Sequence, residues 1–298
     1  MPSLIDIRRR VRSVKNTQQI TKAMKMVSAA KLRCAQDAIT SQRPYAQRLG
    51  SLMRLLSAML NVLMTLPLIA TPDADAHGGP KRLLLVLVTS DRGLCGAFNG
   101  NVIKTASRWI AANGAGYASV TLAFVGRKGY DFYRTKGYTI GTYFQEAGGG
   151  VTFQKAKKVS DALIADYLAG RFTEVKFVYN EFKNAVTQVV RVEDFLPLRP
   201  QGDAKAAATG PDFIIKPSPA EVFASLLEKH FSTQTFRVML ESQAGEHGAR
   251  MSAMENATKN AGEMIRKLTL QYNKQRQAGI TKELLEIIAG SESQKAEA

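Results

Sequence analysis

The sequence predicts an α/β protein in which a long amphipathic helix at each end of the chain flanks a central stretch of alternating strands and helices. Three observations lead to this fold class. First, helix-capping residues mark the start of both terminal helices. Second, small or apolar residues recur at steps of three and four along these helices. Third, apolar runs of strand length alternate with helical stretches in the central part of the chain.

The first helix begins at a capping box, with Ser3 as the N-cap residue and the carboxylate of Asp6 three positions later. Its first apolar residues are Leu4, Ile7, Val11 and Val14, and the stripe then moves to Ile20, Met24, Val27, Cys34, Ala38, Tyr45, Leu49, Leu52 and Leu56. Polar residues such as Gln18 and Thr21 dilute this stripe, and Pro44 is expected to bend the helix or leave one carbonyl unpaired. A two-stranded coiled coil that contains this helix therefore has a narrow apolar interface, so we expect other proteins to surround the coil.

The middle of the chain alternates between strand and helix patterns. Strands are predicted at 83–89, 119–125, 138–144 and 174–181, an edge strand at 187–192, and helices at 97–113 and 152–168. This alternation favours a parallel sheet covered on both faces. Segments rich in Gly, Pro, Ala or Asp at 65–80, 145–150 and 197–217 are predicted to be loops or linkers.

The last helix begins at residues 218–221, where Ser218 is the cap, Pro219 the first helical residue and Glu221 the returning carboxylate. Small or apolar positions follow at Met254, Ala257, Ala261, Met264, Leu268, Gln271, Gln275 and Ala278, and a second stripe ends in Ile280, Leu284 and Ile287. A continuous helix over 219–289 is roughly 105 Å long at about 1.5 Å per residue.

Composition limits the class of protein. The 298 residues are 45% apolar, which is a globular composition, and two cysteines without CxxC spacing argue against a disulfide framework or a zinc site. The apolar run at 55–70 is shorter than a membrane span, and no targeting segment is visible before Ser3. The net charge is +16, of which residues 1–54 contribute +10. This basic helix is either a solvated face or a surface for an acidic partner or nucleic acid.

The turn at residues 90–96 is the segment most suggestive of chemistry. Its glycines follow a strand and precede a helix, where backbone amides can hold an anion, but it has neither the GxGxxG nor the P-loop spacing. Cys95 has no histidine partner in an obvious position, so we interpret it as a buried structural thiol. No set of residues has the spacing of a catalytic site, and the sequence implies neither a cofactor nor a metal.

Three blocks carry a more specific signal. They are VKNTQQITKAMKMV at 14–27, TSDRGLCGAFN at 89–99, and a C-terminal block comprising residues 249–254, 257–258 and YNKQRQAGITKEL at 272–284. In this order they resemble the gamma subunit of F-type ATP synthases. The resemblance implies a long antiparallel coiled coil of the N- and C-terminal helices plus a central Rossmann-like α/β domain. It also implies segments of coil at 1–64, central domain at 81–196, linker at 197–217 and coil at 218–290.

The resemblance further implies a noncatalytic rotor shaft, present in one copy per complex. This shaft would turn inside a ring of three alpha and three beta subunits, be joined to the epsilon subunit and the membrane ring of c subunits, and couple proton flow to catalysis in beta. The positions that match the family's contact regions are Lys22, Met24, Lys25, Arg250, Gln277 and Thr281, with an apolar tip formed by Ile280, Leu284, Ile287 and Ile288. Arg250 and Gln277 are expected to be exposed.

Two other functions remain as alternatives: a basic nucleic-acid-binding protein, and an α/β enzyme acting on a phosphorylated small molecule through the turn at 90–96. Against the first, aromatic residues do not interleave with the N-terminal basic residues. The expected location is peripheral, on the cytoplasmic face of a bacterial plasma membrane, with the matrix side of the mitochondrial inner membrane as the alternative.

Overall fold

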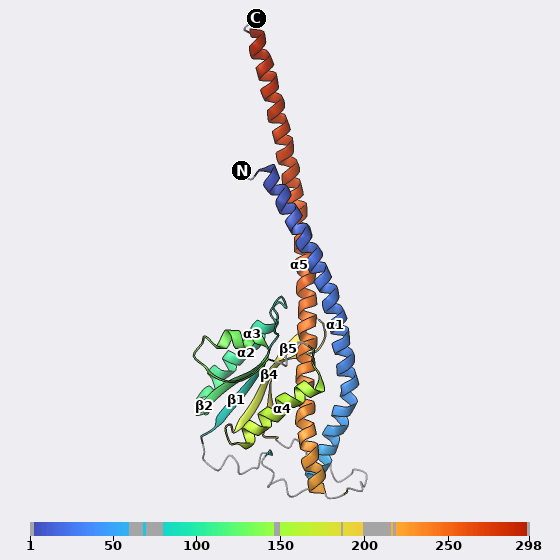
Figure 1. Cartoon of the computed structure of the whole chain (residues 1–298), viewed down its shortest axis with the longest axis vertical. Helices are drawn as coiled ribbons and strands as arrows, with labels where there is room; N and C mark the ends of the chain where they lie inside the picture. Colours follow the sequence, from blue (N-terminus) through green and yellow to red (C-terminus); the bar gives the residue numbers. More distant parts are fainter. Residues whose placement is uncertain are drawn as a thin grey trace. The chain divides into compact units, whose positions relative to one another are not determined.

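The computed structural model describes residues 3–59, 68–69, 80–145, 150–185, 187–198, 216 and 219–296. These residues form two compact units, one made of Met1–Val27 and Met251–Ala298 and the other of Ser28–Arg250. The predicted cap at Ser218 lies outside the described residues, as do most of the predicted loops at 65–80 and 197–217. The long terminal helices and the central sheet confirm the predicted fold class (Figure 1).

The terminal helices are α1, Leu4–Met59, and α5, Pro219–Ala296. The predicted capping box at the start of α1 is present, because the amide nitrogen of Asp6 donates to Ser3 Oγ at 3.2 Å and the amide nitrogen of Ser3 donates to Asp6 Oδ2 at 3.2 Å. Pro44 lies inside α1, which continues past it. Helix α1 therefore tolerates one missing backbone donor.

The central sheet has the strand order β3-β2-β1-β4-β5. Its strands are β1, Arg82–Val88; β2, Ser119–Val125; β3, Thr139–Phe144; β4, Glu174–Phe182; and β5, Gln188–Leu196. The first four strands are parallel, as predicted, but β5 runs antiparallel to β4. The predicted edge strand is therefore present, but the sheet is mixed rather than parallel at this edge. The reason is that only a short turn, closed by Asn184 and Thr187, separates β4 from β5, and a short turn can join only antiparallel strands.

Both faces of the sheet are covered. Alternate residues of β1 enter opposite cores: Leu83, Leu85 and Leu87 pack with α2, Phe98–Asn113, whereas Leu84, Val86 and Val88 pack with α4, Phe153–Leu168. The second core also contains residues of α1 and α5 from the same compact unit, namely Leu49, Met53, Phe223, Leu227 and Phe231. The described structure adds two short helices that the sequence did not predict, α3 at Arg127–Tyr133 and η2 at Gly114–Gly116.

The apolar stripe predicted on α1 has the right period but the wrong phase. Ile7 and Leu49 are buried as predicted, but Ile20, Val27, Cys34, Tyr45 and Leu52 are exposed. The other buried positions of α1 are Thr21, Ser28, Leu32, Ala35, Ile39 and Met53. Small residues with hydroxyl groups occupy part of the buried face of α1. The hydroxyl of Thr21 forms a hydrogen bond within this helix, because its Oγ1 donates to the carbonyl of Gln18 at 3.0 Å. The pattern of hydrophobicity alone does not reveal a seam of this kind.

Candidate functional site

The coiled coil predicted from the two chain ends is visible in the unit formed by Met1–Val27 and Met251–Ala298. Gln18 Nε2 donates to the carbonyl of Thr258 at 3.4 Å, and Thr258 Oγ1 donates to Thr21 Oγ1 at 2.8 Å. Lys25 Nζ lies 2.7 Å from Glu255 Oε1, so residue numbers rise along α1 as they fall along α5. The helices are therefore antiparallel (Figure 1). A methyl group at Gly262 would lie 3.0 Å from Gln18 Nε2, which shows how closely the helices approach.

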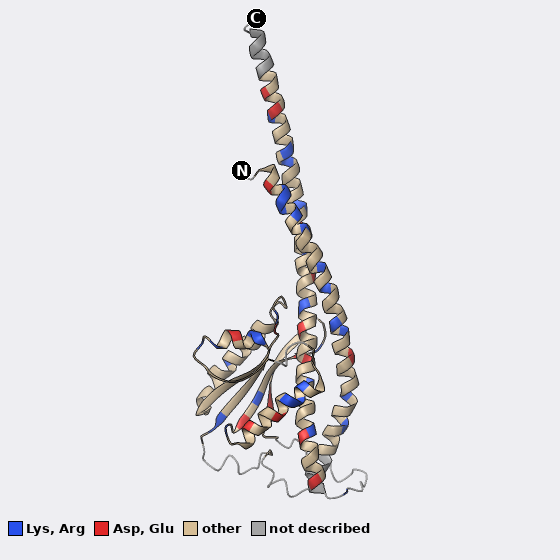
Figure 2. Cartoon of the chain, in the orientation of Figure 1, with Lys and Arg blue, Asp and Glu red and all other residues tan. Residues whose placement is uncertain are grey.

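The predicted contact residues on α1 lie on one helical turn. Lys22 is exposed, Met24 is half-buried, and Lys25 is partly occupied by its ion pair with Glu255. Apolar side chains at Ile20 and Met26 are exposed beside them. Figure 2 shows Lys and Arg distributed along α1 with few acidic residues among them. This turn therefore offers both positive charge and apolar surface to another molecule, and its assignment as an interface stays a prediction.

The C-terminal part of α5 continues past the start of α1 (Figure 1). Extending the antiparallel register of the contacts of Gln18 with Thr258 and of Lys25 with Glu255 to Leu4 places the start of α1 opposite the turn of α5 at 272–276. Beyond that point the predicted apolar tip is exposed, with exposed fractions of 49% for Ile280, 54% for Leu284, 68% for Ile287 and 53% for Ile288. Gln277 is exposed as predicted, and its carbonyl accepts a hydrogen bond from Thr281 Oγ1 at 3.0 Å.

Arg250 differs from its prediction, because it is buried rather than exposed. Its guanidinium donates to the carbonyl of Gly93 at 3.2 Å and to that of Arg92 at 3.4 Å, and it lies 2.7 Å from Glu246 Oε1. Planar, multidentate donation of this kind suits arginine better than lysine. Arg250 thus fastens the turn at 90–96 to α5, and its predicted contact with another subunit stays a prediction.

Burial shifts the pKa values of two titratable side chains next to Arg250, Glu246 and His247. Burial raises the pKa of Glu246, and the charge of Arg250 opposes this only in part. Burial lowers the pKa of His247 to about 4, with Arg250 and Lys31 acting in the same direction. His247 is therefore neutral at pH 7.

We expect Arg250→Met to lower the free energy of unfolding by about 2–3 kcal/mol, because the Glu246 carboxylate and two carbonyls lose their buried donor. Urea unfolding followed by the fluorescence of Trp109, the single tryptophan, measures this change. Arg266→Met, at an exposed position of α5, is the matched control. Equal stability of the two variants would contradict the anchoring role of Arg250.

The turn at residues 90–96 is held by its own side chains. Ser90 Oγ donates to the carbonyl of Arg92 at 2.6 Å, and Asn99 Nδ2 donates to Ser90 Oγ at 2.8 Å and to Cys95 Sγ at 3.3 Å. Cys95 is buried, in agreement with the predicted structural thiol. Leu94, with a φ of 63°, is exposed. The pocket beside this turn is lined by the carboxylates Asp91 and Glu246, which disfavours the alternative of phosphate binding there.

A second ionic cluster joins α5 to strands β4 and β5. Arg237 pairs with Glu193 and with Glu241 Oε1 at 3.2 Å, and it donates to Tyr179 Oη at 3.1 Å. Tyr179 Oη in turn donates to Glu193 Oε2 at 2.6 Å. Burial raises the pKa of Glu241, and Arg237 offsets this only in part; Glu241 Oε2 is buried without a hydrogen-bond partner. Sequence reasoning missed this cluster because its members lie far apart in the chain.

Within the described ranges, no three or more His, Cys, Asp or Glu side chains are grouped as metal ligands would be. Nor does any helix in the same part of the chain have the length and apolar character that crossing a membrane requires.

Comparison with known proteins decides the family. Residues 3–293 match the family model described as ATP synthase. The ATP synthase gamma chain of Bdellovibrio bacteriovorus is 46% identical over 302 residues, a match that covers 99% of this chain and 100% of that relative. The chain belongs to the ATP synthase gamma family. The gamma chain of Chlorobaculum tepidum is 45% identical over 299 residues, with the same coverage of both chains. The family predicted from the three sequence blocks is confirmed.

Solved structures agree with this membership in the gamma family. A chain in the central stalk and c-ring structure of Tetrahymena thermophila mitochondrial ATP synthase is 26% identical, has a TM-score of 0.59, and is matched over 99% of its length and 80% of this chain. A rotor chain of Euglena gracilis mitochondrial ATP synthase has a TM-score of 0.64 at 21% identity, with 98% of that chain and 93% of this one covered, which supports the fold. The chain is a noncatalytic rotor-shaft subunit of ATP synthase.

Proposed function

We propose that this chain turns as a single shaft inside a ring of three alpha and three beta subunits, and that it is joined at its other end to the epsilon subunit and the c ring. The observation that carries this proposal is the antiparallel pairing of the two chain ends, with exposed apolar residues where α5 continues past α1. The proposed division of labour is coil at 1–64 and 218–290, linker at 197–217, and a central domain at 81–196 for the epsilon and c subunits.

In this proposal each stretch of the coil has its own contact. The basic turn of Lys22, Met24 and Lys25 faces an acidic loop of a beta subunit, and Gln277 and Thr281 make polar contacts nearer the C-terminus. The exposed apolar side chains of Ile280, Leu284, Ile287 and Ile288 face an apolar collar at the top of the ring. Arg250 is the weakest member of the set, because its guanidinium is already engaged within the chain.

The work transmitted by such a shaft exceeds what one side-chain contact can carry. Each elementary charge that crosses the membrane releases about 2.3 kcal/mol per 100 mV. A rotation driven by several charges therefore loads the coil by more than a typical contact is worth, and the load must be distributed along α1 and α5. Single changes at Gln277 or Thr281 should consequently reduce rotation-coupled ATP hydrolysis only modestly.

We expect Met24→Lys to weaken coupling more than any of these polar changes, since it adds a charge at a half-buried position between Lys22 and Lys25. Proton pumping per ATP hydrolysed, measured in membrane vesicles, should fall clearly for Met24→Lys and slightly for Met24→Ala. Tyr45→Lys places the same charge at an exposed position of α1 outside this turn and serves as the control. Unchanged pumping in both Met24 variants would rule out the proposed contact.

The partners are tested directly by purifying the native complex through this chain. The proposal expects it to co-migrate with three copies each of two large nucleotide-binding subunits, and with one copy of this chain. We further propose a peripheral location on the cytoplasmic face of a bacterial plasma membrane; recovery from the matrix side of a mitochondrial inner membrane would replace it. A complex that lacks the nucleotide-binding subunits would overturn the proposal.

A further inference from the structure

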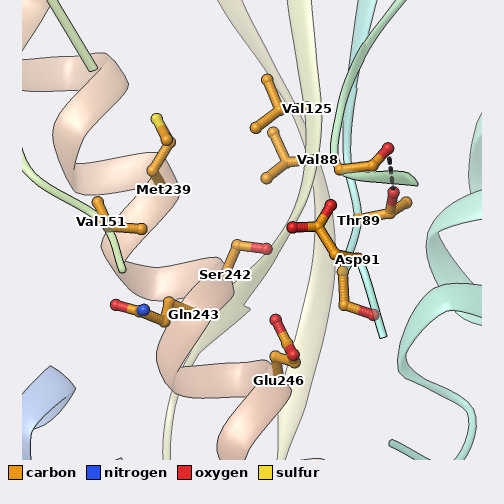
Figure 3. A pocket seen from close by; sticks show the side chains of 11 residues that line it. Val88, Thr89, Asp91, Val125, Val151, Met239, Ser242, Gln243 and Glu246 are labelled. Atoms are coloured by element: carbon orange, nitrogen blue, oxygen red, sulfur yellow. Dashed lines mark hydrogen bonds between the residues drawn. The ribbon is translucent and has the colours of Figure 1, made fainter. Parts of the chain in front are cut away.

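A small pocket opens between α5 and the carboxyl ends of β1 and β2 (Figure 3). Its volume of about 40 Å³ is enough for two or three water molecules or for one terminal group of a larger ligand. One side of the pocket is apolar and the other polar. The apolar side is formed by Val88, Val125, Val151 and Met239, and the polar side includes Asp91, Ser242, Gln243 and Glu246.

The pocket lies where α/β folds commonly bind ligands. In open parallel sheets, ligands bind outside the carboxyl ends of the strands, next to the strand at which the order reverses. Here the strand order reverses between β1 and β4, and the pocket lies one strand away from this point, lined by the ends of β1 and β2 and the residues that follow them. The rotor role assigned above does not use this position.

The polar side of the pocket carries two carboxylates, which only accept hydrogen bonds when ionised, beside Ser242 and Gln243, which can both donate and accept. Asp91 Oδ1 accepts from the amide nitrogen of Arg127 at 3.0 Å, and Glu246 Oε1 pairs with Arg250 at 2.7 Å. Each carboxylate has a second oxygen that can accept a further hydrogen bond. Neither carboxylate can donate one when it is ionised. The two groups are close enough that the charge of Asp91 raises the pKa of Glu246, in addition to the larger effect of burial. A positively charged donor would relieve this repulsion.

Ser242 provides an independent indication of a ligand. It is only 4% exposed, and its hydroxyl has no hydrogen-bond partner among the described residues. Figure 3 shows this hydroxyl directed into the pocket, on the side where the Asp91 carboxylate lies. The hydroxyl oxygen is not one of the fully buried, unpartnered side-chain atoms of the described residues, so a group bound in the pocket can form a hydrogen bond with it.

We propose that this pocket binds the terminal ammonium group of a primary alkylamine. The three N–H donors match the free acceptors of Asp91, Ser242 and Glu246, and the adjoining methylene groups pack against the valine and methionine side chains. Anions are disfavoured by the two carboxylates. The amine comes either from a free small molecule or from a lysine side chain of a neighbouring subunit.

Methyl-resolved NMR of the full-length chain, titrated with butylammonium chloride, tests the proposal. We expect saturable shifts of the methyl groups of Val88, Val125, Val151 and Met239, because these side chains line the apolar side. Tetramethylammonium chloride at the same concentration has the charge but no N–H donors, and should not reproduce them. Absence of saturable shifts, or equal shifts with both salts, would overturn the proposal.

Conservative variants make the test specific to the pocket. Asp91→Asn keeps an oxygen for the amide of Arg127 and should weaken butylammonium binding about tenfold, through loss of one charge-assisted hydrogen bond. Ser242→Ala removes a hydroxyl that bonds nothing within the described chain and should weaken binding several-fold. Asp161→Asn, at an exposed carboxylate of α4, is the matched control and should leave binding unchanged. Equal affinity in all three variants would exclude this pocket as the binding site.

The two sources of the amine are separated in the purified complex by carbodiimide coupling in the presence of butylamine. This reagent joins a carboxylate to an amine in contact with it. An isopeptide bond from Asp91 or Glu246 to another subunit identifies a lysine as the occupant, whereas a butylamide at either residue identifies a pocket open to free amines. If neither product forms while the exposed Asp161 is modified, no amine occupies the pocket in the complex and the proposal fails.

Discussion

Gly126→Ala should lower the free energy of unfolding of the sheet-containing unit by about 3 kcal/mol or more. Gly126 follows β2 with a φ of 97° and a ψ of 147°, a region that residues with a side chain rarely adopt. A Cβ atom there would lie 2.0 Å from the carbonyl oxygen of Thr89. The neighbouring atoms are backbone at the end of β1, so the contact cannot be relieved by rotating a side chain.

The position of Gly126 is fixed from several directions. The amide nitrogen of Thr89 donates to the carbonyl of Val125 at 2.8 Å, and Thr89 Oγ1 accepts from the amide nitrogen of Gly129 at 2.9 Å. Moving Gly126 away from Thr89 would break these bonds at the start of α3. The side chain of alanine would therefore cost both backbone strain and hydrogen bonds, not strain alone.

Gly137→Ala is the matched control for this prediction. Gly137 also has a positive φ, 74°, but a Cβ atom there would meet nothing within 4 Å. Only the backbone strain remains, which is about 1–2 kcal/mol. Urea unfolding followed by Trp109 fluorescence should separate the two variants, and equal losses of stability would show that the close approach to Thr89 is unimportant.

Arg237→Met should destabilise the same unit by about 3 kcal/mol at pH 8. The side chain of Arg237 is partly buried between Glu193 and Glu241, and its removal leaves two carboxylates beside Tyr179 without their cation. Methionine preserves much of the apolar contact of the arginine stem, so the loss is mainly electrostatic. Because Glu241 Oε2 already lacks a partner, no alternative donor is in place to compensate.

The loss of folding stability caused by Arg237→Met should depend on pH. Burial raises the pKa of Glu241 in the folded chain, and Arg237 lowers it, so the pKa rises further when Arg237 is removed. Between the unfolded value of about 4.5 and the raised folded value, the folded state binds more protons than the unfolded state. Stability therefore falls as pH rises through this range, and the deficit of the variant should be smaller at pH 5 than at pH 8.

A double variant, Arg237→Met with Glu241→Gln, provides the internal control for this explanation. Glutamine keeps nearly the same shape without the uncompensated charge, so it should recover about 1–2 kcal/mol of the loss at pH 8 and remove part of its pH dependence. Additive losses from the two substitutions would show that Arg237 does not act through Glu241.

Much of the fold could be predicted from local pattern. The apolar run of β1 and the alternation with α2 and α4 indicated a covered parallel sheet, and the capping box of Ser3 and Asp6 marked the start of α1. The orientation of β5 was not predicted, because it depends on the strand with which β5 pairs, and local pattern does not determine this pairing. The seam of α1 was also missed, because Thr21 and Ser28 are buried while Ile20 and Val27 are exposed.

The surface exposure of the candidate contact residues was also predicted only in part. Residues of a solvent-facing segment, such as Gln277 and Ile280, are exposed as expected, since no other part of this chain lies opposite them in the described register. Arg250 was expected at the surface because it matches a polar contact position of the family. Its burial requires the carbonyls of Arg92 and Gly93, which are about 157 residues away in the sequence.

The sequence by itself determined the helical ends, the α/β centre and the family, because these depend on short-range periodicity, capping and contiguous blocks of residues. Only the tertiary structure decided which face of α1 is buried, how Arg237 and Arg250 are paired, and where Ser242 meets Asp91 in one pocket. Such groupings arise from residues far apart in the chain, and their energy depends on distance and burial, which no local pattern contains.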